Sequence, residues 1–318
     1  MEKLKKTEKK WKGSALSKEY ILSPDELRSL QMVLLEMLLE LDRICKLRNI
    51  KYCIFAGTML GAVRHGGFIP WDDDLDVAMM RAEYIKLRDA CKNDLDESRF
   101  FFQDNTTDPH YRWGYGRIRR KNSEFVRVGQ EHMKMHTGIF LDIFPLDGVP
   151  EFAPLRGMHN FYCFILRKLL YAEAGRKTGK TALTRAWYSL LNKVPHTWTF
   201  RRVYKLTTKW KSSRLVRHLG FPQPKGRVYG FNRVWFEVVS DVGFEGYFFP
   251  GNLDYDSFLT YHYGDYMQIP PSEKRHWHPV SKFMLPIVTT LPEQAQLCSY
   301  LPHRLYHNAQ LCLADVQQ

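Results

Sequence analysis

Apolar residues near the beginning of the chain recur at helical spacing. Leu, Met and Ile residues within Leu27–Leu47 fall on one side of a helix and form a single apolar stripe. Ser23 stands at the N-cap position, Pro24 follows at the first helical position, and Glu26 comes three residues after the cap. The pattern therefore predicts a long amphipathic helix that begins near Ser23.

Short apolar runs separated by polar and glycine-containing segments follow this helix. They predict strands within residues 51–58, 75–80, 98–105, 112–121, 124–130 and 137–150. Helical spacing predicts a short helix over residues 58–66 and an amphipathic helix over residues 82–93. A tight turn at Lys121–Ser123 connects two of the strands. This order of elements indicates an α+β fold with a mixed sheet.

The pattern changes after residue 150. Long, basic and aromatic-rich helical segments predominate up to residue 227, and short motifs return after it. We expect one core that is interrupted by a basic helical insertion. The expected parts are a flexible basic N-terminus (1–20), a first part of the core (21–150), the insertion (151–227), a second part of the core (228–290) and a C-terminal tail (291–318).

The composition is that of a globular protein, with 44% hydrophobic and 14% aromatic residues. The net charge of +13 is concentrated, because residues 167–227 contain sixteen Lys or Arg and one acid, Glu173. Such a segment would suit nucleic acid, anionic lipid headgroups or a phosphate-rich substrate. We expect peripheral contact with an anionic membrane, with Trp187, Trp198 and Trp210 at the interface. The alternative is a basic helical face without a partner.

The cysteines and the distribution of apolar runs bear on the cellular compartment. Six scattered cysteines form no Cys-x-x-Cys pair and mostly have apolar neighbours, which indicates reduced, buried thiols rather than disulfides or a zinc site. The first residues lack the apolar stretch of a secretory signal, and no run of 18 apolar residues occurs. We therefore expect a cytoplasmic protein, with peripheral contact at the inner face of the membrane.

Candidate chemistry is concentrated in the stretch that follows Trp71. Four aspartates lie within five positions, and an extended backbone would place Asp72, Asp74 and Asp76 on one face. Asp73 would point the other way. Crowded carboxylates repel one another unless a cation neutralises them, and their hard oxygen atoms suit Mg²⁺ or Mn²⁺. A solvated loop is the usual alternative for an acidic run, but Trp71 and the apolar strand that follows argue against it.

Two features elsewhere in the chain would complete a site around this acidic run. Gly57 and Thr58, some fifteen residues upstream, form a turn whose backbone N–H groups could bind a phosphate at the start of a helix. Asp142 is an isolated acid in the apolar run GIFLDIFP, which is costly unless it is paired or bound to a metal. Asp147 is a weaker candidate, because Asp-Gly is common in turns. The combination is typical of metal-dependent phosphoryl and nucleotidyl transfer.

Other polar and aromatic residues leave alternatives open. Arg117 and Arg119 lie two apart on one face of a predicted strand, where they could clamp phosphate groups bidentately or form a basic face in solvent. Tyr263 could shape a donor pocket around a cationic headgroup, although a single aromatic residue is more often part of a core. For His276 and His278 we expect surface positions rather than a metal site.

Three stretches resemble the LicD family of phosphotransferases, which also includes the fukutin-type proteins. They are FAGTMLGAVRHGGFIPWDDDLDVAM, LDIFPLDGVP and YGDYMQIPPSEKRHWH, and they occur in family order over roughly residues 35–280. The resemblance implies a nucleotidyltransferase-like fold, with a mixed sheet flanked by helices, and chemistry on CDP-linked donors. Bacterial members typically move phosphocholine from CDP-choline onto a cell-surface glycan or its lipid-linked precursor.

The resemblance also implies roles for individual residues. Gly57 and Thr58 would bind the donor phosphate, Asp72, Asp74 and Asp76 would hold the metal, Asp142 would complete the acidic centre, and Arg64 would contact the pyrophosphate. Attack of an acceptor hydroxyl on the distal phosphorus would release CMP, with Asp142 or an aspartate of the run as the proton acceptor. The cysteine loop of some eukaryotic relatives is missing from the sequence, so no zinc is expected.

Two other functions remain open at this point. A glycosyltransferase would also use an Asp-x-Asp motif to hold a metal and a nucleotide sugar, although the turn at Gly57 favours a phospho-alcohol transferase. A nucleotidyltransferase that acts on nucleic acid would fit the net charge of +13. The chain lacks a clear RNA-binding module, and its basic segment lies away from the acids in sequence, so we expect no nucleic-acid partner.

Overall fold

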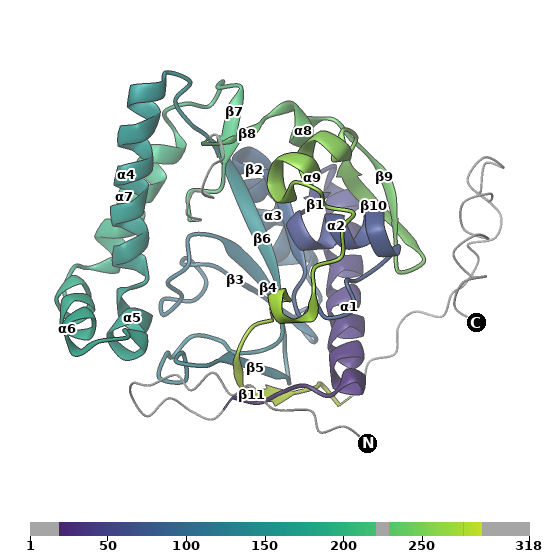
Figure 1. The fold of residues 1–318 in the computed structure, drawn as a ribbon, viewed down its shortest axis with the longest axis horizontal. Helices are drawn as coiled ribbons and strands as arrows, with labels where there is room; N and C mark the ends of the chain where they lie inside the picture. Colours follow the sequence, from purple (N-terminus) through teal and green to yellow (C-terminus); the bar gives the residue numbers. More distant parts are fainter. Residues whose placement is uncertain (1–18, 221–228, 276, 288–318) are drawn as a thin grey trace. The chain divides into compact units, whose positions relative to one another are not determined.

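The structure, a computed structural model, describes residues 19–220, 229–275 and 277–287 (Figure 1). Most of the expected N-terminus (1–20), the expected tail (291–318) and His276 lie outside the described residues. The helices are α1 (Pro24–Arg48), α2 (Ala56–His65), α3 (Arg81–Asp94), α4 (Ala153–Leu170), α5 (Ala172–Thr178), α6 (Ala182–Leu191), α7 (His196–Thr207), α8 (Val234–Glu237), α9 (Tyr255–Tyr263) and the 3₁₀ turn η1 (Ser272–Lys274). The strands are β1 (Cys53–Ile54), β2 (Asp76–Met80), β3 (Phe100–Gln103), β4 (Gly116–Arg120), β5 (Glu124–Arg127), β6 (Phe140–Gly148), β7 (Leu215–Arg217), β8 (Phe231–Asn232), β9 (Val239–Phe244), β10 (Tyr247–Asn252) and β11 (Val280–Met284).

A mixed sheet runs through the described part of the chain in the order β1-β2-β6-β4-β3, and β7 and β8 extend it from the last residues of β6. Strands β2 and β6 are parallel, whereas β1, β4 and β3 pair antiparallel with their neighbours. Figure 1 shows α4 to α7 on one side of this sheet and α1 on the other. The expected α+β class with a mixed sheet is confirmed.

Helix α1 begins as its sequence predicts, and most of its residues from Leu30 to Cys45 are buried. The side chain of Ser23 accepts a hydrogen bond from the N–H of Glu26, and the Glu26 carboxylate accepts one from the N–H of Ser23. Buried residues occupy more than one stripe, because α1 packs against α3, β4 and β6. Even Glu36 is buried, where it pairs with Arg99 and Arg120. The expectation of a single apolar stripe was therefore too narrow.

Two strands differ from their predicted form. Strand β2 begins at Asp76, so residues 72–75 lie outside any strand. The turn at Lys121–Ser123 forms, with Asn122 at φ 56°, but β4 and β5 do not make a hairpin. Strand β4 already has β3 on one edge and β6 on the other, so β5 pairs instead with β11.

Helices α4 to α7 fall within the expected insertion (151–227) and have a core of their own. Cys163 and Leu166 of α4 pack with Phe200 and Val203 of α7 in this core. Among the residues that the structure describes, we find no helix with both the length and the apolarity needed to cross a bilayer.

The cysteines within the described part of the chain agree with the interpretation as reduced, buried thiols. They are Cys45, Cys53, Cys91 and Cys163, and all of them are buried and free of disulfides. Burial raises the pKa of Cys53 to about 12, which keeps the thiol protonated at neutral pH. Cys298 and Cys312 lie outside the described residues.

Candidate active site

The parallel pairing of β2 and β6 brings acids that are distant in sequence close together. Asp76 is the first residue of β2 and lies opposite Asp142 of β6. The N–H of Asp142 donates a hydrogen bond to the carbonyl of Leu75 at 3.0 Å, which holds the end of the acidic run against β6. The structure thus places Asp142 beside the run, where the sequence predicts the acidic centre.

Asp72, Asp74 and Asp76 are half-buried, Asp73 is buried, and the carboxylates of the run repel one another. Burial raises the pKa of Asp72, Asp74 and Asp76, and neighbouring carboxylates raise it further. For Asp76 these neighbours are chiefly Asp74 and Asp142. The side chain of Asp74 is 22% exposed, so a ligand can reach its carboxylate. Hard oxygen donors under mutual repulsion fit a divalent cation such as Mg²⁺ or Mn²⁺.

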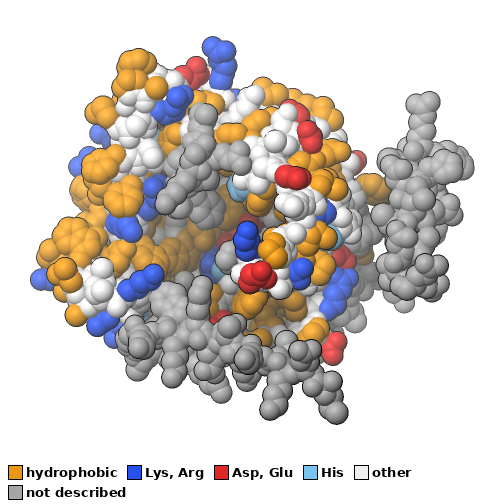
Figure 2. All heavy atoms as spheres, in the orientation of Figure 1, with side chains coloured by type: hydrophobic (Ala, Val, Ile, Leu, Met, Phe, Trp, Pro, Cys, Tyr) orange, Lys and Arg blue, Asp and Glu red, His pale blue; other side chains and the backbone are white. Residues whose placement is uncertain are grey.

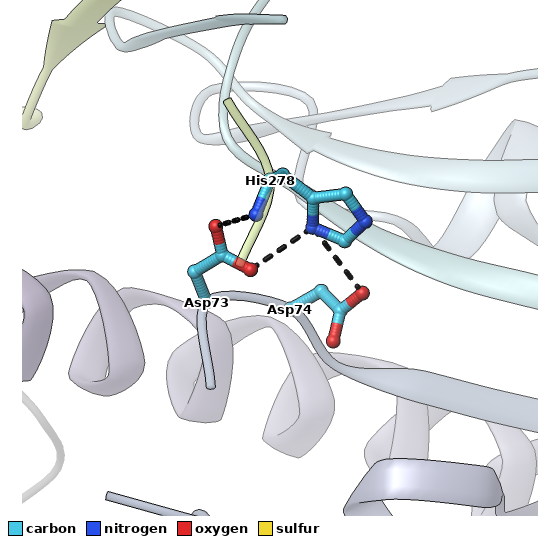
Figure 3. A group of neighbouring side chains, drawn as sticks. All are labelled: Asp73, Asp74 and His278. Atoms are coloured by element: carbon cyan, nitrogen blue, oxygen red, sulfur yellow. Dashed lines mark hydrogen bonds and ion pairs between the residues drawn. The ribbon is translucent and has the colours of Figure 1, made fainter. Parts of the chain in front are cut away.

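His278 joins this centre from the C-terminal part of the core. Its backbone N–H donates to Oδ2 of Asp73 at 2.9 Å, and its ring Nδ1 lies 2.9 Å from Oδ1 of the same residue. Nδ1 also lies 3.6 Å from Oδ2 of Asp74 (Figure 3). One potential ligand atom from each of these three residues lies within 4.8 Å of the other two. The side chain of His278 is 32% exposed, so it reaches the surface, but the acidic run holds its ring, a contact that the sequence analysis did not predict.

The predicted metal ligands overlap only in part with this compact group. Asp74 belongs to both sets, whereas Asp72 and Asp76 lie outside the compact group. Asp72, Asp74 and Asp76 remain our predicted ligands, because a bound cation would relieve the repulsion that raises their pKa. Asp147, the weaker candidate, is buried and accepts hydrogen bonds from Arg81 at 2.6 and 2.8 Å, so it stabilises the fold instead.

The predicted phosphate-binding turn forms the start of α2 and contacts the acidic run. A Cβ atom on Gly57 would lie 3.0 Å from Oδ2 of Asp72, so glycine leaves room for this carboxylate. The hydroxyl of Thr58 accepts a hydrogen bond from the N–H of Asp76 at 2.9 Å. Both residues therefore position the acids, and phosphate binding by the N–H groups of the turn stays a prediction.

Arg64 and Tyr263 meet where α2 packs against α9. Nη1 of Arg64 donates a hydrogen bond to the carbonyl of Tyr266 at 2.8 Å, and Nε of Arg64 donates one to Nε2 of His65 at 2.9 Å. Arg64 thus holds the chain that follows α9, and its contact with pyrophosphate stays a prediction. Partial burial raises the pKa of Tyr263, which is 40% exposed, and the carboxylate of Asp76 raises it further, so the residue lies near the acidic centre. Its part in shaping a donor pocket stays a prediction.

Arg117 pairs with Asp142 instead of facing solvent. Its Nε lies 2.5 Å from Oδ1 and its Nη2 lies 3.3 Å from Oδ2, with the two side chains 2% and 6% exposed. Arg119 is 1% exposed and donates to Gln103 and to the carbonyl of Gly138. The alternative of a basic strand face in solvent is wrong, because both side chains are buried and their guanidinium groups lie over the ring of Phe140.

This pairing changes what we expect of Asp142. Since Arg117 engages both of its oxygens, the carboxylate of Asp142 is held in one position, which favours a positioning role over proton acceptance. Contact of Arg117 or Arg119 with a substrate phosphate would require them to exchange the present bonds for phosphate oxygens, and it stays a prediction.

Arg127 on β5 is a charged group at the centre that the sequence analysis missed. Its guanidinium opposes the rise in the pKa of Asp74 and Asp76. Within the described part of the chain, its buried Nε has no hydrogen-bond partner. An unpaired buried donor costs about 1–3 kcal/mol, so one beside an acidic centre fits a phosphate oxygen of a substrate. A single arginine in a short strand gives no sequence signal, and neither does His278.

Comparison with known proteins agrees with this geometry. A family model described as "LicD/FKTN/FKRP, nucleotidyltransferase domain" matches residues 49–161, which include the turn of α2, the acidic run and Asp142. The lipopolysaccharide cholinephosphotransferase LicD of Haemophilus influenzae is 27% identical over 274 residues, which cover 80% of this chain and 97% of the relative.

Two shorter similarities are to proteins without an assigned function. An uncharacterized protein of Rickettsia prowazekii is 37% identical over 78 residues, 24% of this chain and 29% of that protein. An uncharacterized protein of Rickettsia typhi is 62% identical over 37 residues, 12% of each chain. The family model and the near full-length relative support the resemblance of this chain to the LicD family.

Proposed function

We propose that this protein transfers phosphocholine, or a related phospho-alcohol, from a CDP-linked donor to a hydroxyl group of a cell-surface glycan or its lipid-linked precursor. The observation that carries the proposal is the pairing of β2 with β6, which gathers Asp76 and Asp142 beside the turn at Gly57. The similarity to a lipopolysaccharide cholinephosphotransferase supports phosphocholine as the transferred group and a glycan as the acceptor. The family description supports a nucleotidyltransferase-like arrangement of the core.

The residues of the site have complementary roles in this reaction. Mg²⁺ or Mn²⁺, held by Asp72, Asp74 and Asp76, would neutralise charge on the donor pyrophosphate. The N–H groups at the start of α2 bind one phosphate oxygen, and Arg127 binds another. The acceptor hydroxyl attacks the distal phosphorus in line with the departing CMP, while a carboxylate of the run accepts the proton.

Ligand-dependent stability tests the proposal directly. We expect CDP-choline or CDP-ribitol with Mg²⁺ to raise the melting temperature by about 4 °C when the ligand exceeds its Kd a hundredfold. UDP-sugars and ATP should have no comparable effect. The formation of CMP, followed by ³¹P NMR with a glycan acceptor, would show transfer. Preferential stabilisation by UDP-sugars would instead favour a glycosyltransferase and contradict the proposal.

The close contact at Gly57 gives a second test. Gly57→Ala is expected to lower the transfer rate about tenfold, because the added methyl group must displace the Asp72 carboxylate while the helix is retained. Steady-state kinetics and thermal unfolding would be measured together. The control is Gly157→Ala in α4, where a Cβ meets nothing within 4 Å. Equal transfer rates in the two variants would show that Gly57 does not position Asp72.

A further inference from the structure

Helix α4 has apolar residues on two different faces. Cys163 and Leu166 face inward and are buried in the core of the insertion. Met158, Phe161 and Ile165 follow at spacings of three and four residues on another face, and they are 69%, 65% and 39% exposed. A helix that only covered a core would be polar on its outer face. The outer stripe of α4 therefore needs an explanation beyond the packing of the insertion.

Helix α6 repeats this pattern more strongly. None of its residues, all of which the structure describes, is buried. It packs against α5, and the hydroxyl of its Tyr188 accepts a hydrogen bond from Nζ of Lys168 on α4 at 3.1 Å. Leu183, Trp187 and Leu190 follow at spacings of four and three residues, and they are 81%, 55% and 55% exposed. Helix α6 thus exposes an apolar face while a different residue anchors it.

The two exposed stripes are linked into one surface. Nζ of Lys168 lies 5.3 Å from the ring centre of Phe164 on α4 and 5.8 Å from that of Tyr188 on α6. We call the exposed residues the apolar ridge, which consists of Met158, Phe161, Phe164, Ile165, Leu183, Trp187 and Leu190. Figure 2 shows hydrophobic side chains along the edge of the molecule formed by α4 and α6, with Lys and Arg side chains beside them.

The charge of the same helices identifies the partner. Residues 153–207 contain eleven Lys or Arg and one acid, Glu173, which pairs with Arg112 at 2.7 Å. A second copy of this surface would carry the same positive charge and would be repelled, whereas anionic lipid headgroups would be attracted. Exposed Trp and Leu surrounded by Lys and Arg are also the composition of helices that lie in a bilayer interface.

We propose that the apolar ridge inserts into the surface of an anionic lipid bilayer, with the surrounding lysines and arginines on the headgroups. Of the three tryptophans expected at the interface, Trp187 lies on the ridge and Trp198 is 41% exposed. Trp210 is packed against the core of the insertion, with its ring centre 4.9 Å from that of His159, so its expected position at the interface is wrong. In this proposal, exposed apolar residues of α4 take the place at the interface that we had expected for Trp210. This inference does not depend on the proposed transfer reaction.

Vesicle flotation tests the ridge with a matched pair of variants. The full chain is expected to float with vesicles of phosphatidylglycerol and phosphatidylcholine, to bind phosphatidylcholine vesicles weakly, and to lose binding as salt rises. Leu183→Ser with Leu190→Ser should weaken binding at least about tenfold, because two apolar side chains no longer enter the lipid. Leu253→Ser, at a leucine that is 56% exposed outside the insertion, should bind like the unchanged chain.

Circular dichroism and turnover of a soluble donor would show that the variants are folded, and they would separate a failure of the ridge from a failure of the proposed reaction. Failure of the full chain to float with anionic vesicles would overturn the proposal. So would equal binding by the double variant and by Leu253→Ser. A dimer in sedimentation equilibrium that the double variant abolishes would instead assign the ridge to self-association, and it would overturn the proposal as well.

Discussion

Asp76→Asn is expected to lower the transfer rate about a thousandfold without destabilising the fold. Asp76 lies opposite Asp142, and burial together with Asp74 and Asp142 raises its pKa. Asparagine keeps the shape of the side chain and removes one of the repelling charges, so the free energy of unfolding should stay level or rise. A loss of rate with unchanged or increased stability is what a site that holds a cation predicts.

Kinetics at saturating donor, a titration of Mg²⁺ followed by the rate, and urea unfolding would be measured on the same preparations. Asp241→Asn is the control, because Asp241 lies exposed on β9. A rate within a factor of about three of the unchanged enzyme would exclude Asp76 from the metal site. Large destabilisation would mean instead that Asp76 holds the fold together.

Local signals in the sequence were sufficient for the elements that lie close to the acidic run. The capping box predicted where α1 begins, and the apolar run around Asp142 predicted β6. The grouping of Asp142 with the acids followed from the cost of burying an isolated carboxylate. Each of these inferences uses residues a few positions apart, where spacing determines which side chains share a face.

Local sequence patterns did not predict contacts between distant parts of the chain. His278 bonds to Asp73 across 205 residues, and spacing cannot report that pairing. The environment of the β4 arginines was ambiguous for the same reason. A strand with alternating basic residues has the same sequence pattern whether its basic face lies in solvent or in the interior. Only the groups packed against that face, such as the rings of Tyr115 and Phe140, decide that Arg117 is buried.

Arg117→Met is expected to lower the free energy of unfolding by about 3–5 kcal/mol, because it leaves the carboxylate of Asp142 unpaired among buried residues. The pair lies within 2.5 Å, and both side chains are less than one tenth exposed. Urea unfolding would measure the loss. Arg48→Met is the control, because its ion pair with Asp94 leaves the arginine side chain 51% exposed, and its effect should be far smaller.

The double variant Arg117→Met with Asp142→Leu separates the ion pair from the packing of the arginine. It removes both charges and keeps apolar volume in the sheet, so it should recover most of the stability that the single variant loses. It should nevertheless be inactive, since the acidic centre loses Asp142. If Arg117 served chiefly to bind substrate phosphate, Arg117→Met would lower activity with little loss of stability, and the double variant would recover nothing.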